Sequence, residues 1–246
     1  MPKLYNNSYH YYNDIAHDYD GMYNDEYWKC SQEHIKTIME KYVSNFVNLK
    51  VLDIGSGTGN WAKWLVERGA HVTLVEPAQN MIKIAKEKLK SISHNCLFIN
   101  NAIENVTEIG KYDVILLLGD VLSYVKDYDI VMRKILCFSK YGTLVFGTVD
   151  NYYSYIRDVI TYGEWEDFIY LKSNQKIPIG SKYGCFISRA FDEEDIRQLA
   201  EKYQMEVLEL TGLAIFKNSH LNERYGKYFL KEAEHLLFTL RVKVGE

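Results

Sequence analysis

The most informative stretch of this sequence is VLDIGSGTG, residues 51–59. An apolar run leads to Asp53 and Ile54, and glycines then occupy positions 55, 57 and 59. Glycine adopts positive φ and lets a ligand approach the backbone closely. One glycine would suffice for a tight turn from a strand into a helix, so the glycine repeat favours a nucleotide-like ligand at this turn.

The sequence around this turn alternates between short apolar runs and helix-like segments. Strands are predicted at 50–54, 71–75, 96–99, 112–118, 142–148, 205–210 and 234–244. Helices are predicted between them at 60–67, 78–90, 127–138 and 193–202. Runs almost continuous in Val, Ile and Leu, separated by helices, are typical of a parallel sheet covered on both faces. The sequence therefore predicts a doubly wound α/β fold.

Two segments lie outside this alternation. Residues 1–48 are predicted to form a helical cap, with helices at 9–23 and 31–46 and Ser31 as a possible N-cap. Residues 151–190 are rich in tyrosine and are predicted to be an aromatic insertion after the fifth strand, with strand-like pieces near 167–172 and 184–190.

The insertion is short for a core of its own, so one domain is expected over residues 1–246. Within it, residues 49–150 are expected to bind a cofactor, 151–190 to cover the substrate, and 191–246 to complete the sheet.

Composition excludes several function classes. A net charge of −4 disfavours a protein whose main function is to bind the phosphates of nucleic acids. The cysteines are far apart and form no Cys/His cluster, so no metal is predicted. The N-terminus lacks an apolar signal core, and the longest apolar run, 114–118, is too short to span a bilayer. We therefore expect a cytoplasmic protein without a membrane partner.

The glycine spacing narrows the classes of nucleotide that the turn could bind. A nicotinamide fingerprint, GxGxxG, would place its last glycine at position 60, which is Asn60. No GxxxxGK[ST] pattern for a triphosphate is present. Glu76 ends the second predicted strand, where a carboxylate can accept hydrogen bonds from ribose hydroxyls. Glu76 suits several nucleotide-binding classes, so the glycine spacing is the better discriminator.

These residues carry a family resemblance. VLDIGSGTGNWAKWL (51–65) followed by VTLVEPAQNMIKIAKEKL (72–89) resembles the class I S-adenosylmethionine-dependent methyltransferases of the small-molecule type. Weaker matches are FINNAIENV (98–106), YDVILLLGDVLSYV (112–125), the N-terminal YNDIAHDYDGMY (12–23), and the tail pieces 189–212 and 234–243. The resemblance covers nearly the whole chain, but the insertion at 151–190 matches no motif of the family.

The resemblance implies a mostly parallel seven-stranded sheet and S-adenosyl-L-methionine as the cofactor. That cofactor carries no phosphate, which agrees with the absence of Lys and Arg from the glycine turn. Asp53 would either orient the glycine loop or contact the ammonium of the cofactor. The implied cofactor-binding residues are Tyr19, Asp53, Gly55, Ser56, Gly57, Gly59, Glu76, Pro77, Met81, Asn101, Ala102, Ile103, Gly119, Asp120 and Val121.

The expected reaction is in-line methyl transfer to a small-molecule acceptor, an amine or a hydroxyl. Candidate catalytic residues are Asp120, Tyr124 and Tyr152, and candidate substrate-binding residues are Tyr12, Tyr153 and Arg189. Each has a structural alternative: a helix cap for Asp120, packing for the tyrosines, and a solvent-facing sheet edge for Arg189. The histidines considered as bases are His10, His17 and His220, each of which also fits an ordinary surface or packed histidine.

Three other functions stay open at this point. They are an RNA or protein methyltransferase of the same fold, a nicotinamide-dependent oxidoreductase, and a binding protein that retains the cofactor fold without turnover. The identity of the acceptor and the oligomeric state are not predicted.

Overall fold

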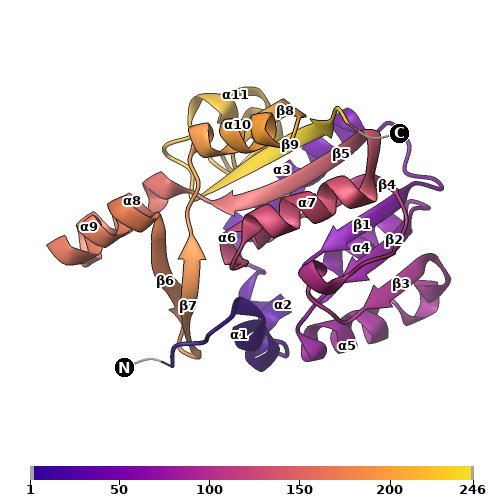
Figure 1. Cartoon of the computed structure of the whole chain (residues 1–246), viewed down its shortest axis with the longest axis horizontal. Coiled ribbons are helices and arrows are strands. Elements are labelled where there is room, and N and C mark those ends of the chain that lie inside the picture. The colour runs from indigo at the N-terminus through magenta and orange to yellow at the C-terminus, as the bar shows by residue number, and fades with distance from the viewer. Residues whose placement is uncertain (1–2, 245–246) are drawn as a thin grey trace.

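A computed structural model describes residues 3–244, and Figure 1 shows a layered α/β molecule. Within that range the main sheet has seven strands in the order β3-β2-β1-β4-β5-β9-β8. Their bounds are β1 Lys50–Ile54, β2 His71–Val75, β3 Cys96–Ile99, β4 Tyr112–Leu117, β5 Ser139–Asp150, β8 Met205–Gly212 and β9 His235–Val242. Neighbouring strands from β3 to β5 are parallel, and β9 runs antiparallel between β5 and β8. The predicted doubly wound, mostly parallel sheet is confirmed.

Helices cover both faces of the sheet (Figure 1). Those that follow the core strands are α4 Asn60–Val66, α5 Gln79–Lys88, α6 Val121–Tyr124, α7 Tyr128–Phe138 and α10 Glu193–Lys202, with 3-10 turns η1 Lys90–Asn95 and η2 Ile103–Asn105. Val51 packs in one buried cluster with Leu65 of α4, whereas the adjacent Leu52 packs in another with Ile135 of α7. Successive strand residues thus face opposite layers, and each fully buried side chain contributes about 1.5–3 kcal/mol.

The N-terminal segment is helical but is divided differently from the prediction. It contains α1 Ser8–Ile15, α2 Tyr19–Met22 and α3 Glu26–Tyr42. The predicted N-cap role of Ser31 is wrong, because Ser31 lies inside α3 and its hydroxyl donates to the carbonyl of Tyr27. Asp25 is the N-cap, and its carboxylate accepts from the Trp28 N–H at 2.9 Å.

The segment after β5 contains α8 Tyr152–Tyr162, α9 Trp165–Asn174 and the hairpin of β6 Lys176–Ser181 and β7 Gly184–Arg189. The strand predicted at 184–190 is therefore present, but the one at 167–172 is wrong. Glu164 and Asp167 form a reciprocal capping box that starts α9, and Leu171 is buried at helical spacing from Phe168. A short apolar run alone does not distinguish a strand from a helix.

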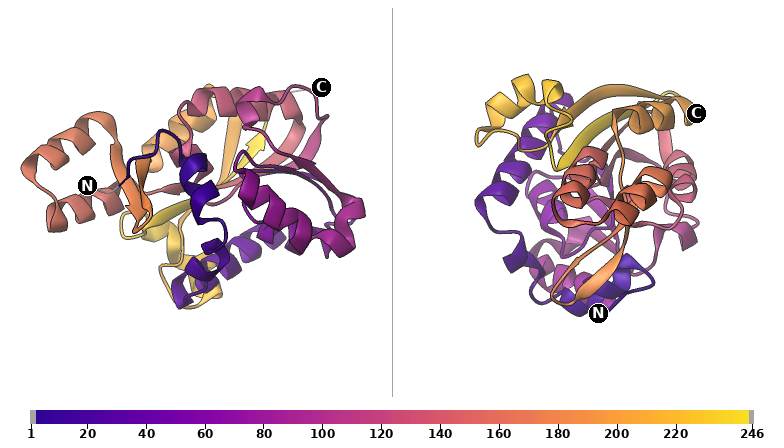
Figure 2. Two further views of the ribbon diagram at one scale, coloured as in Figure 1. Left: turned by 90° about the horizontal axis from the view of Figure 1, so that it is seen from below. Right: turned by 90° about the vertical axis from the view of Figure 1, so that its left-hand side faces the viewer.

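The N-terminal segment and the β6–β7 hairpin join into one layer over the carboxyl edge of the sheet. The Tyr5 N–H donates to the Cys185 carbonyl and the Cys185 N–H donates to the Lys3 carbonyl, both at 2.8 Å. The Tyr11 hydroxyl donates to Ser181 Oγ at 2.9 Å. Figure 2 shows α1 beside the hairpin, while α8 and α9 project outward.

The remaining elements are α11 Ser219–Tyr225 and the 3-10 turn η3 Gly226–Tyr228, which lie between β8 and β9. Among the helices of residues 3–244, none combines the length and the apolar character that a membrane span requires.

Candidate active site

The glycine turn after β1 is held by the acid that ends β2. Glu76 Oε2 accepts from the Gly57 N–H at 2.9 Å, and Glu76 Oε1 accepts from the Ala78 N–H at 2.8 Å. Gly57 has φ +53°, and a Cβ built there would meet only the Tyr19 ring, at 3.9 Å. The turn therefore presents bare backbone on one side, and a positive φ makes glycine the favoured residue.

A pocket opens beside this turn along the carboxyl edge of the sheet. About 950 Å³ of space free of protein atoms lies within it, including the part that is open to solvent. Ten of the predicted cofactor-binding residues line it: Tyr19, Gly55, Gly57, Glu76, Pro77, Met81, Ala102, Ile103, Gly119 and Val121. Tyr12 and Tyr124 line it as well. The structure thus brings segments from five parts of the chain to one cavity.

Five predicted cofactor residues do not line the pocket: Asp53, Ser56, Gly59, Asn101 and Asp120. Gly59 has a packing role, because a Cβ there would lie 3.1 Å from the Ala85 Cβ of α5. Asn101 accepts from the Ala102 N–H at the start of η2 and is exposed.

Asp53 lies directly beneath the turn and is 1% exposed. Its Oδ2 has no hydrogen-bond partner among the residues that the structure describes. Burial, together with the nearby Glu76 charge, raises the pKa of Asp53 to about 7. Glu76 holds the loop through the Gly57 N–H, and a contact between Asp53 and the cofactor stays a prediction.

Partly buried tyrosines form the other wall of the pocket. Tyr12 packs against Tyr19 with ring centroids 5.9 Å apart, and against Tyr124 at 6.0 Å. Burial raises the pKa of all three hydroxyls well above the ordinary tyrosine value, so they are neutral hydrogen-bonding groups. A sulfonium bound here would meet aromatic rings rather than water.

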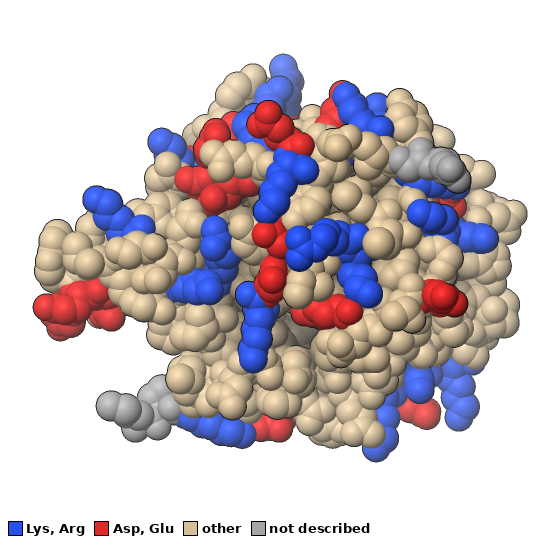
Figure 3. All heavy atoms as spheres, viewed as in Figure 1, with Lys and Arg blue, Asp and Glu red and all other residues tan. Residues whose placement is uncertain are grey.

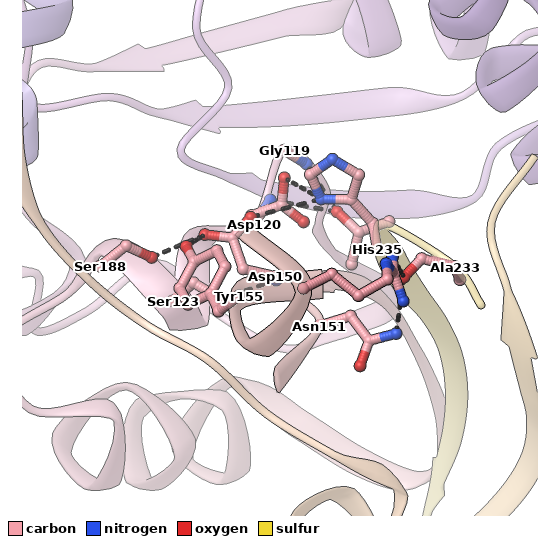
Figure 4. A network of polar contacts seen from close by, with 11 residues as sticks. Gly119, Asp120, Ser123, Asp150, Asn151, Tyr155, Ser188, Ala233 and His235 are labelled. Carbon is pink, nitrogen blue, oxygen red and sulfur yellow. Dashed lines mark hydrogen bonds and ion pairs between the residues drawn. The ribbon is translucent and has the colours of Figure 1, made fainter. Parts of the chain in front are cut away.

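A buried charged cluster adjoins the pocket (Figure 4). His235 Nδ1, at the start of β9, lies 3.3 Å from Asp120 Oδ2 and 3.3 Å from Asp150 Oδ1. Asp150 ends β5, and its other oxygen accepts from the hydroxyls of Tyr155 and Ser188. Asp120 follows β4 in a left-handed conformation, φ +61°, between the pocket residues Gly119 and Val121.

The cluster fixes the charge state of the imidazole. Burial by itself lowers the pKa of His235, but the Asp120 and Asp150 carboxylates outweigh it and raise that pKa well above its ordinary value. For Asp150, burial raises the pKa, and the hydrogen bond and charge of His235 only partly lower it. The two carboxylates therefore favour the protonated, positively charged form of His235.

Three predicted residues lie elsewhere. Tyr152 and Tyr153 pack together on α8, outside the pocket lining, and the Lys231 ammonium lies 5.0 Å from the Tyr153 ring centroid. Arg189 stacks on the rings of Tyr128 and Phe191, and its Nη2 donates to Gln175 at 2.6 Å. None of these side chains reaches the pocket in this structure.

The predicted histidine bases, His10, His17 and His220, are exposed. The charged cluster uses His235 and Asp150 instead, which sequence reasoning missed. Asp150 carried a readable signal, since it ends an apolar strand as Glu76 does. His235 carried a weaker one: it begins the final strand, and only an antiparallel placement brings that end to the carboxyl edge.

Comparison with known proteins agrees with this geometry. A family model described as a methyltransferase domain matches residues 27–210. The ubiquinone biosynthesis O-methyltransferase of Coxiella burnetii is 25% identical over 186 residues, which are 73% of this chain and 74% of that protein.

Two solved structures share the fold. An S-adenosylmethionine-dependent methyltransferase from Clostridium acetobutylicum superimposes with a TM-score of 0.65 at 20% identity, covering 95% of this chain and 99% of that one. The 1,6-didemethyltoxoflavin-N1-methyltransferase of Burkholderia thailandensis gives a TM-score of 0.67 at 13% identity, covering 96% and 88%.

Proposed function

Since the chain belongs to the methyltransferase-domain family and is an S-adenosylmethionine-dependent methyltransferase, we propose that it methylates a small molecule at a hydroxyl or amine. The observation that carries this proposal is the enclosure of the pocket by tyrosines under the N-terminal layer. Tyr12 and Tyr124 line the pocket and pack against Phe186 of β7, with ring centroids 5.8 Å and 5.1 Å away.

The cofactor is proposed to lie along the pocket from β3 to β4. Ala102, Ile103 and Met81 would hold the adenine, and the Glu76 carboxylate would accept from the ribose hydroxyls. The Gly57 backbone, Asp53 and Tyr19 would hold the amino-acid end. This arrangement places the sulfonium beside Gly119 and Tyr124, next to the charged cluster.

Surface charge supports a small acceptor over a nucleic acid. On the face shown in Figure 3, Lys and Arg are interspersed with Asp and Glu rather than gathered into one basic surface. The net charge of −4 points the same way. The similar proteins are named for methylating oxygen in one case and nitrogen in another, so both atoms are retained in the proposal.

The chemistry needs few protein groups. A lone pair of the acceptor attacks the methyl carbon, the carbon–sulfur bond breaks with its electron pair going to sulfur, and the products are the methylated acceptor and S-adenosylhomocysteine. The protein aligns the three atoms and excludes water. The N-terminal layer and the insertion at 151–190 are proposed to provide that enclosure.

Calorimetric titration tests the proposal. S-adenosylmethionine and S-adenosylhomocysteine should bind, and NAD should not. Methyl transfer from radiolabelled cofactor to a panel of small phenols and amines should then identify the acceptor class. Transfer to total tRNA or to cell proteins, with no small molecule labelled, would overturn the small-molecule assignment.

A further inference from the structure

The chain carries a projecting arm with large apolar side chains that nothing in residues 3–244 covers. The arm, residues 152–174, consists of α8 and α9, which bury Val159 and Leu171 in a small cluster of their own. Beyond that cluster the arm leaves five large side chains exposed: Ile160, Tyr162, Trp165, Ile169 and Tyr170. The exposed fractions reach 86% for Tyr162 and 67% for Trp165. Large apolar groups gathered on one exposed element mark an interaction surface.

The outer half of the arm is acidic. Figure 3 shows acidic side chains gathered at its projecting end. The carboxylates of this half are Asp158, Glu164, Glu166 and Asp167. Arg157 lies at the base of the arm and is occupied there, because its guanidinium donates to the Lys231 carbonyl at 2.6 Å. Lys172 lies in the last turn of α9, so the outer half keeps an excess of negative charge.

A second exposed surface, the basic segment, lies beside the base of the arm. It comprises residues 216–231, which include α11 and η3 and hold four Lys and Arg residues with one acid. The Arg224 guanidinium carbon lies 5.2 Å from the Tyr225 ring centroid, and the Lys227 ammonium lies 5.2 Å from that of Tyr228. The large apolar side chains that this segment exposes are Leu221, Tyr225, Tyr228 and Phe229.

The two surfaces have opposite charge and lie on the same side of the molecule, toward the left of Figure 1. The Lys231 ammonium lies over the Tyr153 ring of α8, which joins the end of the basic segment to the arm. A nucleic acid or an anionic membrane on the basic segment would also meet the acidic arm and be repelled by it. A second copy of this chain presents both charges and complements both surfaces.

We propose that the chain forms a two-fold dimer in which the acidic arm of each copy packs on the basic segment of the other. α8 has 11 residues and is about 16 Å long, so the tip of the arm stands away from the basic segment beside its own base. A two-fold axis between two antiparallel arms brings each tip to the basic segment of the second copy. Both contacts then form together, and the assembly closes at two copies.

The exposed rings give this interface its apolar centre. More than half of the large apolar side chains that are exposed within residues 3–244 belong to the arm or the basic segment. Tyr and Trp are enriched at the centre of protein interfaces, and complementary charges around them fix the orientation of the partners. Neither surface contributes a residue to the pocket lining, so the dimer and the proposed methyl transfer are independent properties.

Sedimentation velocity tests the dimer. At low salt and micromolar concentration the wild type should sediment with the mass of two chains rather than the 28.8 kDa of one. Because the contacts pair opposite charges, the dissociation constant should rise about 10-fold or more between about 0.05 M and 0.5 M NaCl. A wild type that is monomeric at every protein concentration would overturn the inference.

Charge exchange identifies the surfaces. Glu166→Lys on the arm and Lys227→Glu on the basic segment should each weaken the dimer about 10-fold or more, since each places like charges opposite one another. The variant with both changes restores the attraction and should recover most of that loss. Glu108→Lys makes the same change of charge on the exposed loop before β4 and should dimerise as the wild type does.

Far-ultraviolet circular dichroism should be the same in all four variants, because the changed side chains are exposed. An equally weakened dimer in Glu108→Lys, or a double variant weaker than either single one, would contradict the assigned surfaces. Failure of the wild type to bind S-adenosylhomocysteine would refute the proposed function and leave the dimer standing.

Discussion

Glu76 accepts a hydrogen bond from the Gly57 N–H at 2.9 Å, so the acid that ends β2 holds the turn that follows β1. In dinucleotide-binding folds, the acid at this position is assigned to hydrogen bonds with the ribose hydroxyls alone. Here its two oxygens already bind backbone amides, at Gly57 and Ala78. Each carboxylate oxygen accepts more than one hydrogen bond, so Glu76 can position the turn and bind a ligand together.

A substitution in the glycine turn should impair cofactor binding more than it impairs folding. Valine at Gly57 would be strained at positive φ and would project toward the proposed cofactor. We expect Gly57→Val to weaken S-adenosylhomocysteine binding by more than about 100-fold, equivalent to about 3 kcal/mol. The matched control is Gly142→Val, which carries similar strain at φ +85° at the opposite end of β5. It should lower the melting temperature and keep cofactor affinity; an equal loss of affinity in both variants would contradict the assignment.

Asp20 should link the N-terminal helices to the cofactor turn. Its carboxylate accepts from Thr58 Oγ1 at 2.6 Å, Asn60 Nδ2 at 3.0 Å and Lys88 Nζ at 2.7 Å. Asp20→Asn should weaken cofactor binding several-fold, because the neighbouring Tyr19 loses its anchor. Asp14→Asn changes a comparably exposed carboxylate, which pairs with Lys3 at 2.9 Å away from the turn. Calorimetry should show a smaller effect for Asp14→Asn.

Cofactor binding should release a proton near neutral pH. Burial raises the pKa of Glu76 to about 7, although the N–H groups of Ala78 and Gly57 partly lower it. Ribose hydroxyls need the ionised form, so affinity should rise as pH increases through 7. Titration in buffers of different ionisation enthalpy measures the released proton. Glu76→Gln should reduce that release to whatever Asp53 supplies.

The same carboxyl group should also affect the stability of the ligand-free protein. Its contribution to stability should fall as pH rises, whereas cofactor affinity should rise. The folded pKa of about 7 exceeds the ordinary value of 4.5, so the folded state binds the proton more tightly. The resulting stabilisation is complete below pH 4.5 and is lost as pH rises through 7. Its size is roughly 3 kcal/mol at 1.36 kcal/mol per unit. Urea unfolding at pH 5 and pH 8 should show a smaller difference in Glu76→Gln than in the wild type.

The centre of the sheet should not tolerate a side chain at Gly147. A Cβ there would lie 2.2 Å from the Phe238 ring of the adjacent β9. Gly147→Ala should lower the free energy of unfolding by about 1–3 kcal/mol or more. Gly21→Ala lies in α2 with nothing within 4 Å and should be neutral or slightly stabilising. Equal effects of the two changes would show that Phe238 can move aside.

The sequence predicted the parts of the fold that local patterns encode. The strands β1, β2 and β3 follow continuous apolar runs, and the glycine turn with Glu76 gave the cofactor end of the site. The strand predicted at 167–172 was wrong because Phe168 to Leu171 reads equally well as a helix face. The capping box of Glu164 and Asp167 held the missing signal.

The residues of the Asp120–His235–Asp150 cluster were harder to predict from the sequence, because they come together only through the pairing of strands that are distant in the chain. Asp120, Asp150 and His235 lie far apart in the chain and meet only where β4, β5 and β9 align. Arg189 and Tyr153 fit a site by residue type, yet they pack on Phe191 and Lys231 instead. No local sequence pattern predicts which of its possible neighbours such a side chain packs against.

The position of β9 has a consequence for how the chain matures. It is the last strand within residues 3–244, yet it fills the space between β5 and β8. Until it pairs, both neighbours expose unpaired backbone groups, which invite aggregation. A polypeptide released from the ribosome before residue 235 would therefore keep its glycine turn but carry an open seam through the sheet, prone to intermolecular pairing.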